Sequence, residues 1–281
     1  MSFDINALAI DVEEWFHICE EDIYRVAGDP EKLEERVRRN TEKIIELIKK
    51  YRQRASFYFV GWVAERYPEL VRIVADNGFE IGCHSYFHNV IYKMSLEEFE
   101  RDLIKATEVI YKTSNIMPIG YRAPGFSLKK GMNWYFDILS KHGYKYDASV
   151  FPTYRAHGGI VDAPIRPYLI KTNYGDLMEF PQSVTGLYKF KLCFSGGGYF
   201  RLLPLSFVMS QIKRLNKKNI PVLFYIHPRE VDPEQPRMKL SFWKAFKYYV
   251  NLDKTTEKFE TILKEFKFES VDKVLNKYFN H

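Results

Sequence analysis

Cysteine is scarce in this chain of 281 residues, and Cys19, Cys83 and Cys193 form no short paired spacing. A framework of disulfide bonds is therefore not expected. The chain also lacks an apolar run long enough to cross a bilayer, which predicts a protein without a transmembrane segment. Residues 1–6 contain no basic region followed by an apolar stretch, so we expect no secretory signal and a cytoplasmic location.

Neither sign of charge dominates the sequence, because 42 basic and 36 acidic residues leave a net charge of only +6. The basic residues at 36–39 and 213–218 alternate with apolar residues at helical spacing. This pattern predicts solvated helix faces, so we expect no nucleic-acid partner. A weak association with an anionic membrane or a membrane-linked glycan is left open by the mild positive charge.

No repeat, low-complexity tract or Pro/Gly-rich linker divides the chain, which favours a single domain over residues 1–281. Strand-like and helix-like patterns alternate as far as residue 150, which predicts a parallel sheet with right-handed crossovers. The length suits a (β/α) barrel. Prolines and glycines interrupt residues 151–200, where we expect an irregular insertion. The expected helices are 30–51, 68–77, 95–113, 129–142, 204–218 and 253–265.

Two histidines, His84 and His88, follow an expected strand at residues 79–83. If the chain turns helically after His84, positions i and i+4 lie on one face with Cβ atoms about 5–6 Å apart. Such a pair suits two bonds to one metal ion. The alternative is a pair of histidines that are hydrogen-bonded in a loop or partly buried. The carboxyl ends of strands are where α/β barrels build their active sites, which favours the metal pair.

Two carboxylates end the first expected strand. Because side chains alternate along a strand, Asp11 and Glu13 point to one face and Val12 to the other. Carboxylates at a buried strand end need a positive partner, such as a divalent ion or an arginine. For the remaining acids we expect a solvated loop; these are Glu14, Glu20, Glu21 and Asp22.

Three more titratable side chains stand at the ends of expected strands: Arg122, Asp147 and His227. Each alone has an ordinary interpretation, as a surface arginine, a turn cap and a structural histidine. Five such strand ends in one chain are poorly explained by chance. They predict one polar site at a single end of the sheet.

This set of residues resembles the polysaccharide deacetylases of the NodB-homology type, carbohydrate esterase family 4. The resemblance covers about residues 5–235 and includes all five family motifs in order. The sequence His-Ser-Tyr-Phe-His-Asn at 84–89 is the sharpest match, and Arg122-Ala123-Pro124 resembles the arginine motif. Longer phrases at 11–16, 196–204 and 227–237 are similar to a subgroup associated with bacterial exopolysaccharide loci.

The resemblance implies a distorted (β/α) barrel of the NodB-homology type. It also implies a metal-dependent hydrolase that removes N-acetyl groups from N-acetylhexosamine units of a bacterial polysaccharide. The implied metal is zinc, with cobalt, nickel or manganese as alternatives. Its implied ligands are Glu13, His84 and His88. Asp11 would be the general base held by Arg122, and His227 the general acid with its tautomer fixed by Asp147.

Two departures from the family pattern matter. The family's first motif has adjacent aspartates, whereas Val12 separates the acids here, and strand alternation favours Glu13 over Glu14 as the ligand. Gly125 stands where the family has an aromatic residue, and its backbone N–H remains available as an oxyanion donor. Two alternatives stay open: a deformylase or small cyclic-amide hydrolase on the same fold, and a glycan-binding protein that has lost the chemistry.

Overall fold

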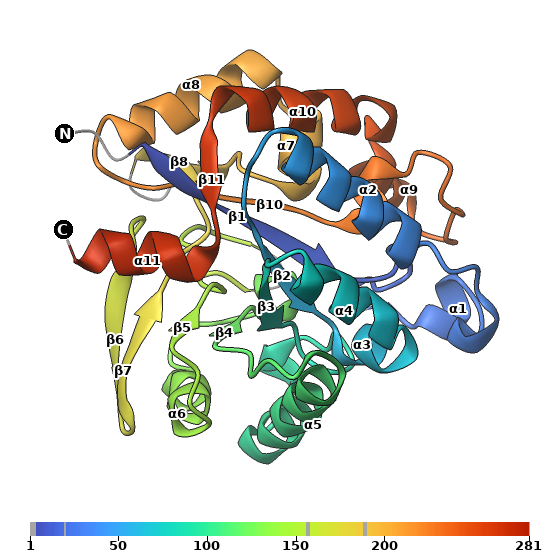
Figure 1. The fold of residues 1–281 in the computed structure, drawn as a ribbon, viewed down its shortest axis with the longest axis horizontal. Coiled ribbons are helices and arrows are strands. Elements are labelled where there is room, and N and C mark those ends of the chain that lie inside the picture. Colours follow the sequence, from blue (N-terminus) through green and yellow to red (C-terminus); the bar gives the residue numbers. More distant parts are fainter. Residues whose placement is uncertain (1–3, 20, 156–157, 188–189, 281) are drawn as a thin grey trace.

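A curved sheet of parallel strands organises the molecule (Figure 1). The computed structural model describes residues 4–19, 21–155, 158–187 and 190–280. The strands of the sheet follow the order β10-β1-β2-β3-β4-β5-β7-β6, and β11 also pairs with β1. Every pairing is parallel except that of β6 with β7. The predicted parallel sheet is therefore confirmed.

The strands of this sheet are β1 (Ile5–Val12), β2 (Ser56–Phe59), β3 (Glu80–Cys83), β4 (Gly120–Tyr121), β5 (Tyr146–Asp147), β6 (Tyr168–Thr172), β7 (Gly175–Glu179), β10 (Leu223–Ile226) and β11 (Lys267–Glu269). A separate hairpin consists of β8 (Val184–Leu187) and β9 (Phe190–Cys193). The helices are α1 (Ile23–Val26), α2 (Val37–Lys50), α3 (Gly61–Arg66), α4 (Pro68–Asp76), α5 (Leu96–Ser114), α6 (Asn133–Lys141), α7 (Gly197–Leu202), α8 (Leu205–Asn216), α9 (Phe242–Tyr249), α10 (Thr255–Glu265) and α11 (Val271–Phe279).

Most helices lie where the hydrophobic periodicity places them, but the first long one is shorter than predicted. Pro30–Lys32 forms only a 3₁₀ turn, and α2 begins at Val37. The start of α5 follows its sequence signal, because Ser95 and Glu98 form a reciprocal capping box. Among the described residues, no helix is both long enough and apolar enough to cross a membrane.

The expected irregular insertion at 151–200 is wrong in its main part, because the segment supplies a strand of the sheet. β7 pairs in parallel with β5, and β6 returns beside it as a hairpin. The sheet then ends at β6 on one side and at β10 on the other. Polar side chains span this opening: Ser183 Oγ accepts from Leu223 N, and Gln182 Nε2 donates to Leu223 O. The result is a distorted barrel.

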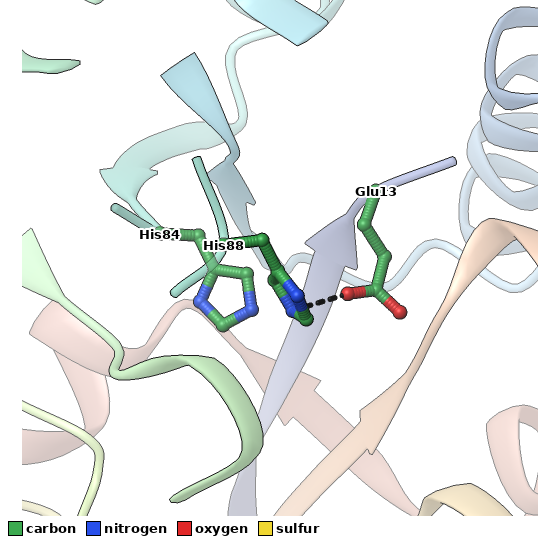
Figure 2. A group of neighbouring side chains, drawn as sticks. All are labelled: Glu13, His84 and His88. Carbon is green, nitrogen blue, oxygen red and sulfur yellow. Dashed lines mark ion pairs between the residues drawn. The ribbon is translucent and has the colours of Figure 1, made fainter. Parts of the chain in front are cut away.

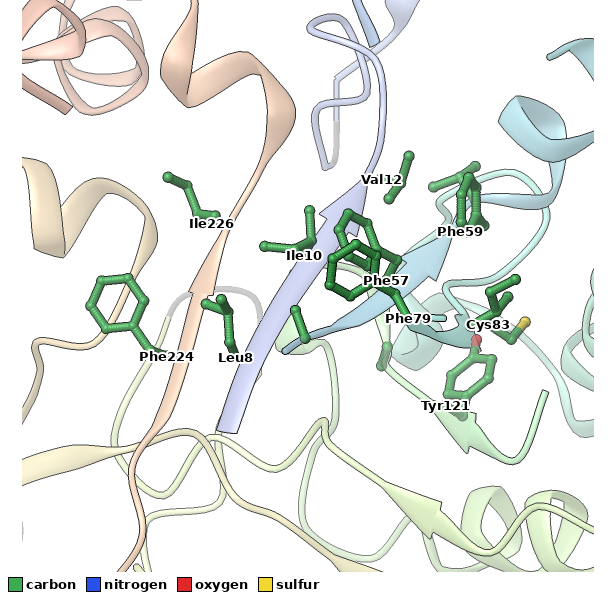
Figure 3. Packing of buried hydrophobic residues seen from close by; sticks show 14 of the residues in the cluster. Leu8, Ile10, Val12, Phe57, Phe59, Phe79, Cys83, Tyr121, Phe224 and Ile226 are labelled. Atoms are coloured by element: carbon green, nitrogen blue, oxygen red, sulfur yellow. The ribbon is translucent and has the colours of Figure 1, made fainter. Parts of the chain in front are cut away.

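Alternation along β1 separates two apolar layers. Leu8, Ile10 and Val12 pack outward with Phe57 and Phe59 against the helices (Figure 3). The intervening positions contribute small side chains, those of Ala7 and Ala9, to the barrel interior. The same alternation of side chains along the strand that points Ala7 and Ala9 into the barrel also points Asp11 and Glu13 inward. The two carboxylates therefore point inward at the end of a strand that is otherwise apolar.

The barrel interior below these carboxylates is filled by two tyrosines. Their hydroxyl oxygens, on Tyr58 and Tyr146, lie 2.8 Å apart. Glycine lies beneath each ring: a Cβ atom added to Gly82 would come within 2.4 Å of Tyr58, and one added to Gly120 within 2.0 Å of Tyr146. Both contacts are far below van der Waals distance. The glycines therefore make room for the aromatic filling.

Gly120→Ala is accordingly expected to destabilise the protein by about 1–3 kcal/mol, the usual cost of overpacking a dense core. The methyl group would collide with the ring of Tyr146, which is held from both sides. Urea unfolding measures the change, with Glu108→Ala on the exposed face of α5 as the control. An unchanged free energy of unfolding for Gly120→Ala would contradict this description of the interior.

Candidate metal centre and active site

Three potential metal ligands meet at the carboxyl end of the barrel. Glu13 follows β1, and His84 and His88 follow β3. One ligand atom from each of them lies within 4.8 Å of the other two, and all three residues are buried. Figure 2 shows the three side chains pointing toward one another. The structure thus brings together the carboxylate and the two imidazoles that the sequence indicated.

The sequence analysis expected a helical turn after His84 to bring the two histidines together. That expectation is wrong, because residues 84–88 do not form a helical turn. The connecting loop instead contains two residues in the left-handed region, Ser85 with φ 66° and His88 with φ 59°. Asp102 of α5 holds the loop by accepting from Tyr86 N at 2.8 Å. The imidazole centroids of His84 and His88 consequently lie 5.2 Å apart.

The protonation of His84 suits a metal ligand. Its Nδ1 lies 2.6 Å from Arg122 O, and because a carbonyl can only accept, Nδ1 carries the proton and Nε2 keeps its lone pair. Burial lowers the pKa of His84 to about 4, which favours the neutral ring. His88 Nε2 lies 2.6 Å from Glu13 Oε2 (Figure 2). A neutral imidazole is the form that binds zinc.

The carboxylate of Glu13 is held ionised. Burial alone would raise its pKa, but the nearby His88, His227 and Arg229 bring it well below the usual range. A buried carboxylate with two imidazoles is a donor set used by divalent zinc, copper, iron and nickel. The residues present therefore fit a divalent transition metal.

Asp11 forms a buried ion pair with Arg122 beside these ligands. The Nε atom of Arg122 lies 2.8 Å from Oδ1 and 3.0 Å from Oδ2 of Asp11. Arg122 is fully buried and also donates to Ala148 O at 2.7 Å and to Gln182 Oε1 at 3.4 Å. With its guanidinium fixed from several directions, Arg122 can orient the carboxylate of Asp11.

His227 faces the same space from the end of β10. Its Nε2 lies 3.8 Å from Asp11 Oδ2 and 3.7 Å from Glu13 Oε1. Its Nδ1 lies 2.9 Å from Glu230 Oε2. Burial would lower the pKa of His227, but the carboxylates of Glu13 and Glu230 raise it above its usual value. The ring is therefore poised to hold a proton at Nε2, toward the site.

The predicted pairing of His227 with Asp147 is wrong. Asp147 Oδ1 accepts from Tyr135 Oη at 2.8 Å and from Ser149 Oγ. Its other neighbour is the buried Glu179, and burial together with the Asp147 charge raises the pKa of Glu179 well above its usual value. One carboxyl of this pair holds a proton. Asp147 therefore braces the ends of β5 and β7, and Glu230 takes the expected place beside His227.

Glu14 also differs from its prediction, because it is buried and not solvated. Its carboxylate accepts from the backbone N–H groups of Arg36 and Val37, at the start of α2. Burial raises the pKa of Glu14 to about 7. Glu14 thus caps a helix, whereas the carboxylate of Glu13 points toward His88. Glu20 lies outside the described residues. The prediction is also wrong for Glu21, whose side chain is 8% exposed and pairs with Arg25 and with Lys244 of α9. Asp22 is at the start of α1 and accepts from Tyr24 N.

Gly125 lies in a tight turn at residues 124–126 and has a positive φ of 61°. A Cβ atom there would come within 2.7 Å of Cys19 Sγ. Both constraints require glycine at this position. The role of its N–H as an oxyanion donor stays a prediction.

Sequence reasoning missed the residues that support His227 and Arg122. Glu230 Oε1 lies 2.8 Å from Nε of the buried Arg201, and Gln182 connects Arg122 to Ser195 through a 2.7 Å hydrogen bond. The only available signal was the spacing of Glu230, three residues after His227. Burial would raise the pKa of Glu230, but Arg201 and His227 lower it to about 2, so it remains an anion.

Comparison with known families divides the chain in two. Residues 29–146 match the polysaccharide deacetylase family, and residues 148–276 match a domain of unknown function, DUF3473. A peptidoglycan deacetylase of Helicobacter pylori is 32% identical over 108 residues, which are 38% of this chain and 36% of that protein. A peptidoglycan-N-acetylglucosamine deacetylase of Bacillus cereus is 30% identical over 95 residues, 34% of each protein. The chain thus spans about a third of the length of these relatives.

Solved structures resemble the chain over nearly its whole length. A Mycobacterium smegmatis protein assigned as a polysaccharide deacetylase has a TM-score of 0.63 at 15% identity, covering 99% of this chain and 92% of that one. The Puue allantoinase has a TM-score of 0.64 at 14% identity, covering 99% and 91%. These likenesses show the fold and confirm the predicted barrel. The family predicted from the motifs is the one matched by residues 29–146.

Proposed function

We propose that this chain, which carries a polysaccharide deacetylase domain of the NodB-homology type, removes N-acetyl groups from N-acetylhexosamine units of a bacterial polysaccharide with the help of a divalent metal ion. One observation carries the proposal: the Glu13, His84 and His88 ligand atoms gather within 4.8 Å, beside the Asp11–Arg122 pair and His227. We further propose that residues 1–281 act as one domain.

The metal would be held by Glu13, His84 and His88, and zinc is the ion that we propose first. A bound divalent ion supplies Lewis-acid polarisation of the amide carbonyl and a lowered pKa for its water. The tautomer lock of His84 on Arg122 O and the ionised carboxylate of Glu13 prepare this chain for such an ion.

Asp11 is the proposed general base. Its carboxylate accepts the proton of the attacking water, and the buried Arg122 keeps that carboxylate oriented and compensates its charge. Gly125 N–H is the proposed donor to the developing oxyanion. The role of Asp11 requires no rearrangement of the ion pair, because Asp11 and Arg122 are already in contact.

His227 is the proposed general acid, and it delivers its Nε2 proton to the leaving amine. Proton delivery is required because an unprotonated amine is a poor leaving group. The Nδ1–H of His227 donates to Glu230 Oε2, which fixes the tautomer and stabilises the charged ring. Glu230 is a positioning residue in this scheme, and Arg201 holds it in turn.

Acetate release tests the proposal. The purified chain is incubated with a chitooligosaccharide, after chelation and after re-addition of zinc, cobalt, nickel or manganese. We expect acetate only when a metal is restored. Peptidoglycan fragments form a second substrate arm, because the curated relatives are named as peptidoglycan deacetylases.

The same assay separates the alternatives from the proposal. Turnover of an N-formyl sugar or of allantoin, without acetate release, would indicate the deformylase or cyclic-amide hydrolase; the Puue allantoinase shares the fold. Binding of the glycan without turnover by the metal-loaded protein would indicate an inactive member. We propose a cytoplasmic location and an exopolysaccharide substrate as the finer parts of the function.

Glu230→Ala is expected to lower kcat by about 10- to 100-fold, part of the 10²–10⁴-fold that a positioned acid contributes. Its loss leaves Nδ1 of His227 without its 2.9 Å partner, while the metal ligands are untouched. Metal content by elemental analysis is therefore expected to stay at the wild-type level. Glu230→Asp should recover part of the rate, and an unchanged kcat for Glu230→Ala would contradict the role.

A further inference from the structure

Helix α9 presents an aromatic face that the rest of the described chain does not cover. Phe242 is 74% exposed, Trp243 70% and Phe246 44%. The last two residues of the helix fasten it to the molecule. Tyr248 Oη donates to Trp15 O at 2.7 Å, and Tyr249 Oη accepts from Met238 N at 2.8 Å. A firmly attached helix thus displays three large apolar side chains to the exterior.

This aromatic face lies at the same end of the barrel as the metal ligands. The segment that contains α9 follows the carboxyl end of β10, just as α1 follows that of β1. The two segments touch, because Lys239 N donates to Val26 O at 2.7 Å and Lys244 pairs with Glu21. Tyr24, on the neighbouring helix α1, is 69% exposed as well. Figure 1 shows both helices on the side toward which β1 points.

The segment that carries the aromatic face is basic. Residues 236–252 contain no aspartate or glutamate. They contain four exposed cations: Arg237, Lys239, Lys244 and Lys247. Aromatic side chains flanked by lysines on one amphipathic helix are typical of segments that lie in the interface of an anionic membrane.

We propose that α9 docks on the surface of an anionic lipid bilayer, with Phe242, Trp243 and Phe246 in the interface and the flanking cations on the lipid phosphates. The positive charge of residues 236–252 complements a negative lipid surface. Docking this end of the barrel brings the metal ligands close to the membrane. The docking itself does not depend on the proposed reaction.

Two other occupants fit the chemistry less well. Sugar hydroxyls are commonly bound by carboxylate or amide groups, yet residues 236–252 carry no acid, and the side-chain nitrogen of their one amide, Asn251, donates to Arg201 O at 3.1 Å. Two of the three exposed rings are phenylalanines, which have no polar group. A second copy of the chain in a two-fold contact would bring this basic surface against itself. Repulsion between like charges disfavours that arrangement.

Vesicle co-sedimentation tests the docking. The full chain is mixed with vesicles of phosphatidylcholine alone or of phosphatidylcholine with phosphatidylglycerol. We expect binding only to the vesicles that contain phosphatidylglycerol, with a blue shift of Trp243 emission. F242S/W243S and K239E/K247E should each weaken binding by about tenfold or more, because both apolar burial and lipid charge contribute. Tyr174→Ser, at an exposed aromatic residue on the β6–β7 turn, is the matched control and should bind normally.

These variants lie outside the proposed catalytic machinery, so acetate release from a soluble chitooligosaccharide reports correct folding independently of the vesicles. Equal binding to both kinds of vesicle, or binding unaffected by F242S/W243S, would overturn the proposal. The proposal would also be overturned if the unmodified chain sediments with neither kind of vesicle while F242S/W243S loses self-association or glycan binding. If the unmodified chain binds the vesicles but releases no acetate, the result counts against the proposed reaction and leaves the docking supported.

Discussion

Asp11→Asn is expected to lower kcat by about 10²–10⁴-fold while the protein still binds its metal. The amide keeps the size of the carboxylate but cannot accept the proton of the attacking water. The three proposed metal ligands are Glu13, His84 and His88, so the substitution leaves them all in place. Steady-state acetate release together with elemental analysis measures both quantities on the same preparation.

The matched control for this variant is Glu14→Gln, which likewise replaces a buried carboxylate near the end of β1 by an amide. Glu14 caps α2 through Arg36 N and Val37 N, and a glutamine oxygen can still accept from these groups. Its kcat per folded molecule should remain close to the wild-type value. Near-normal turnover in Asp11→Asn combined with loss in Glu14→Gln would contradict the assignment of the inward face of β1.

The double variant H84A/H88A is expected to lose its metal and its activity together. Only Glu13 of the three ligands would remain, and one carboxylate binds a divalent ion poorly. Elemental analysis should show near-zero metal content after dialysis, and acetate release should fall to the level of the chelated wild type. Each single alanine variant should show an intermediate metal affinity.

The control for metal loss is Cys83→Ser, since Cys83 precedes His84 but packs outward in the apolar core. Its metal content should stay at the wild-type level in the folded protein. Full metal content in H84A/H88A would show that the ion binds elsewhere, and the proposed centre would then be wrong.

Local periodicity predicted the parts of the site that depend on one strand. Alternation along β1 placed Asp11 and Glu13 inside and Val12 outside, because neighbouring side chains on a strand face opposite ways. The same alternation explains why Cys83, directly before His84, packs in the apolar core. Apolar runs that end in a charged residue correctly marked the carboxyl ends of β1, β3 and β10.

Features that depend on loops could not be predicted in this way. His84 and His88 lie close together because the backbone has positive φ at two non-glycine residues, Ser85 and His88. Such a conformation is uncommon for these residue types and has no signal in the sequence. The orienting partner of His227 comes from the turn after β10, so a motif that points to Asp147 leads to the wrong carboxylate. β7 was not predicted from the sequence. It begins at an exposed hairpin with Gly175 and Asp176, so the first half of the strand lacks an apolar pattern.

The central claim is that Glu13, His84 and His88 hold the catalytic ion. Crystals of the zinc-loaded chain, measured at the zinc absorption edge, test it most directly through the anomalous signal. We predict one strong peak, with a Glu13 oxygen at about 2.0–2.2 Å and both imidazoles at about 2.0–2.1 Å. A peak elsewhere in the molecule, or an ion bound by the Glu14 carboxylate with Glu13 turned away, would contradict the account.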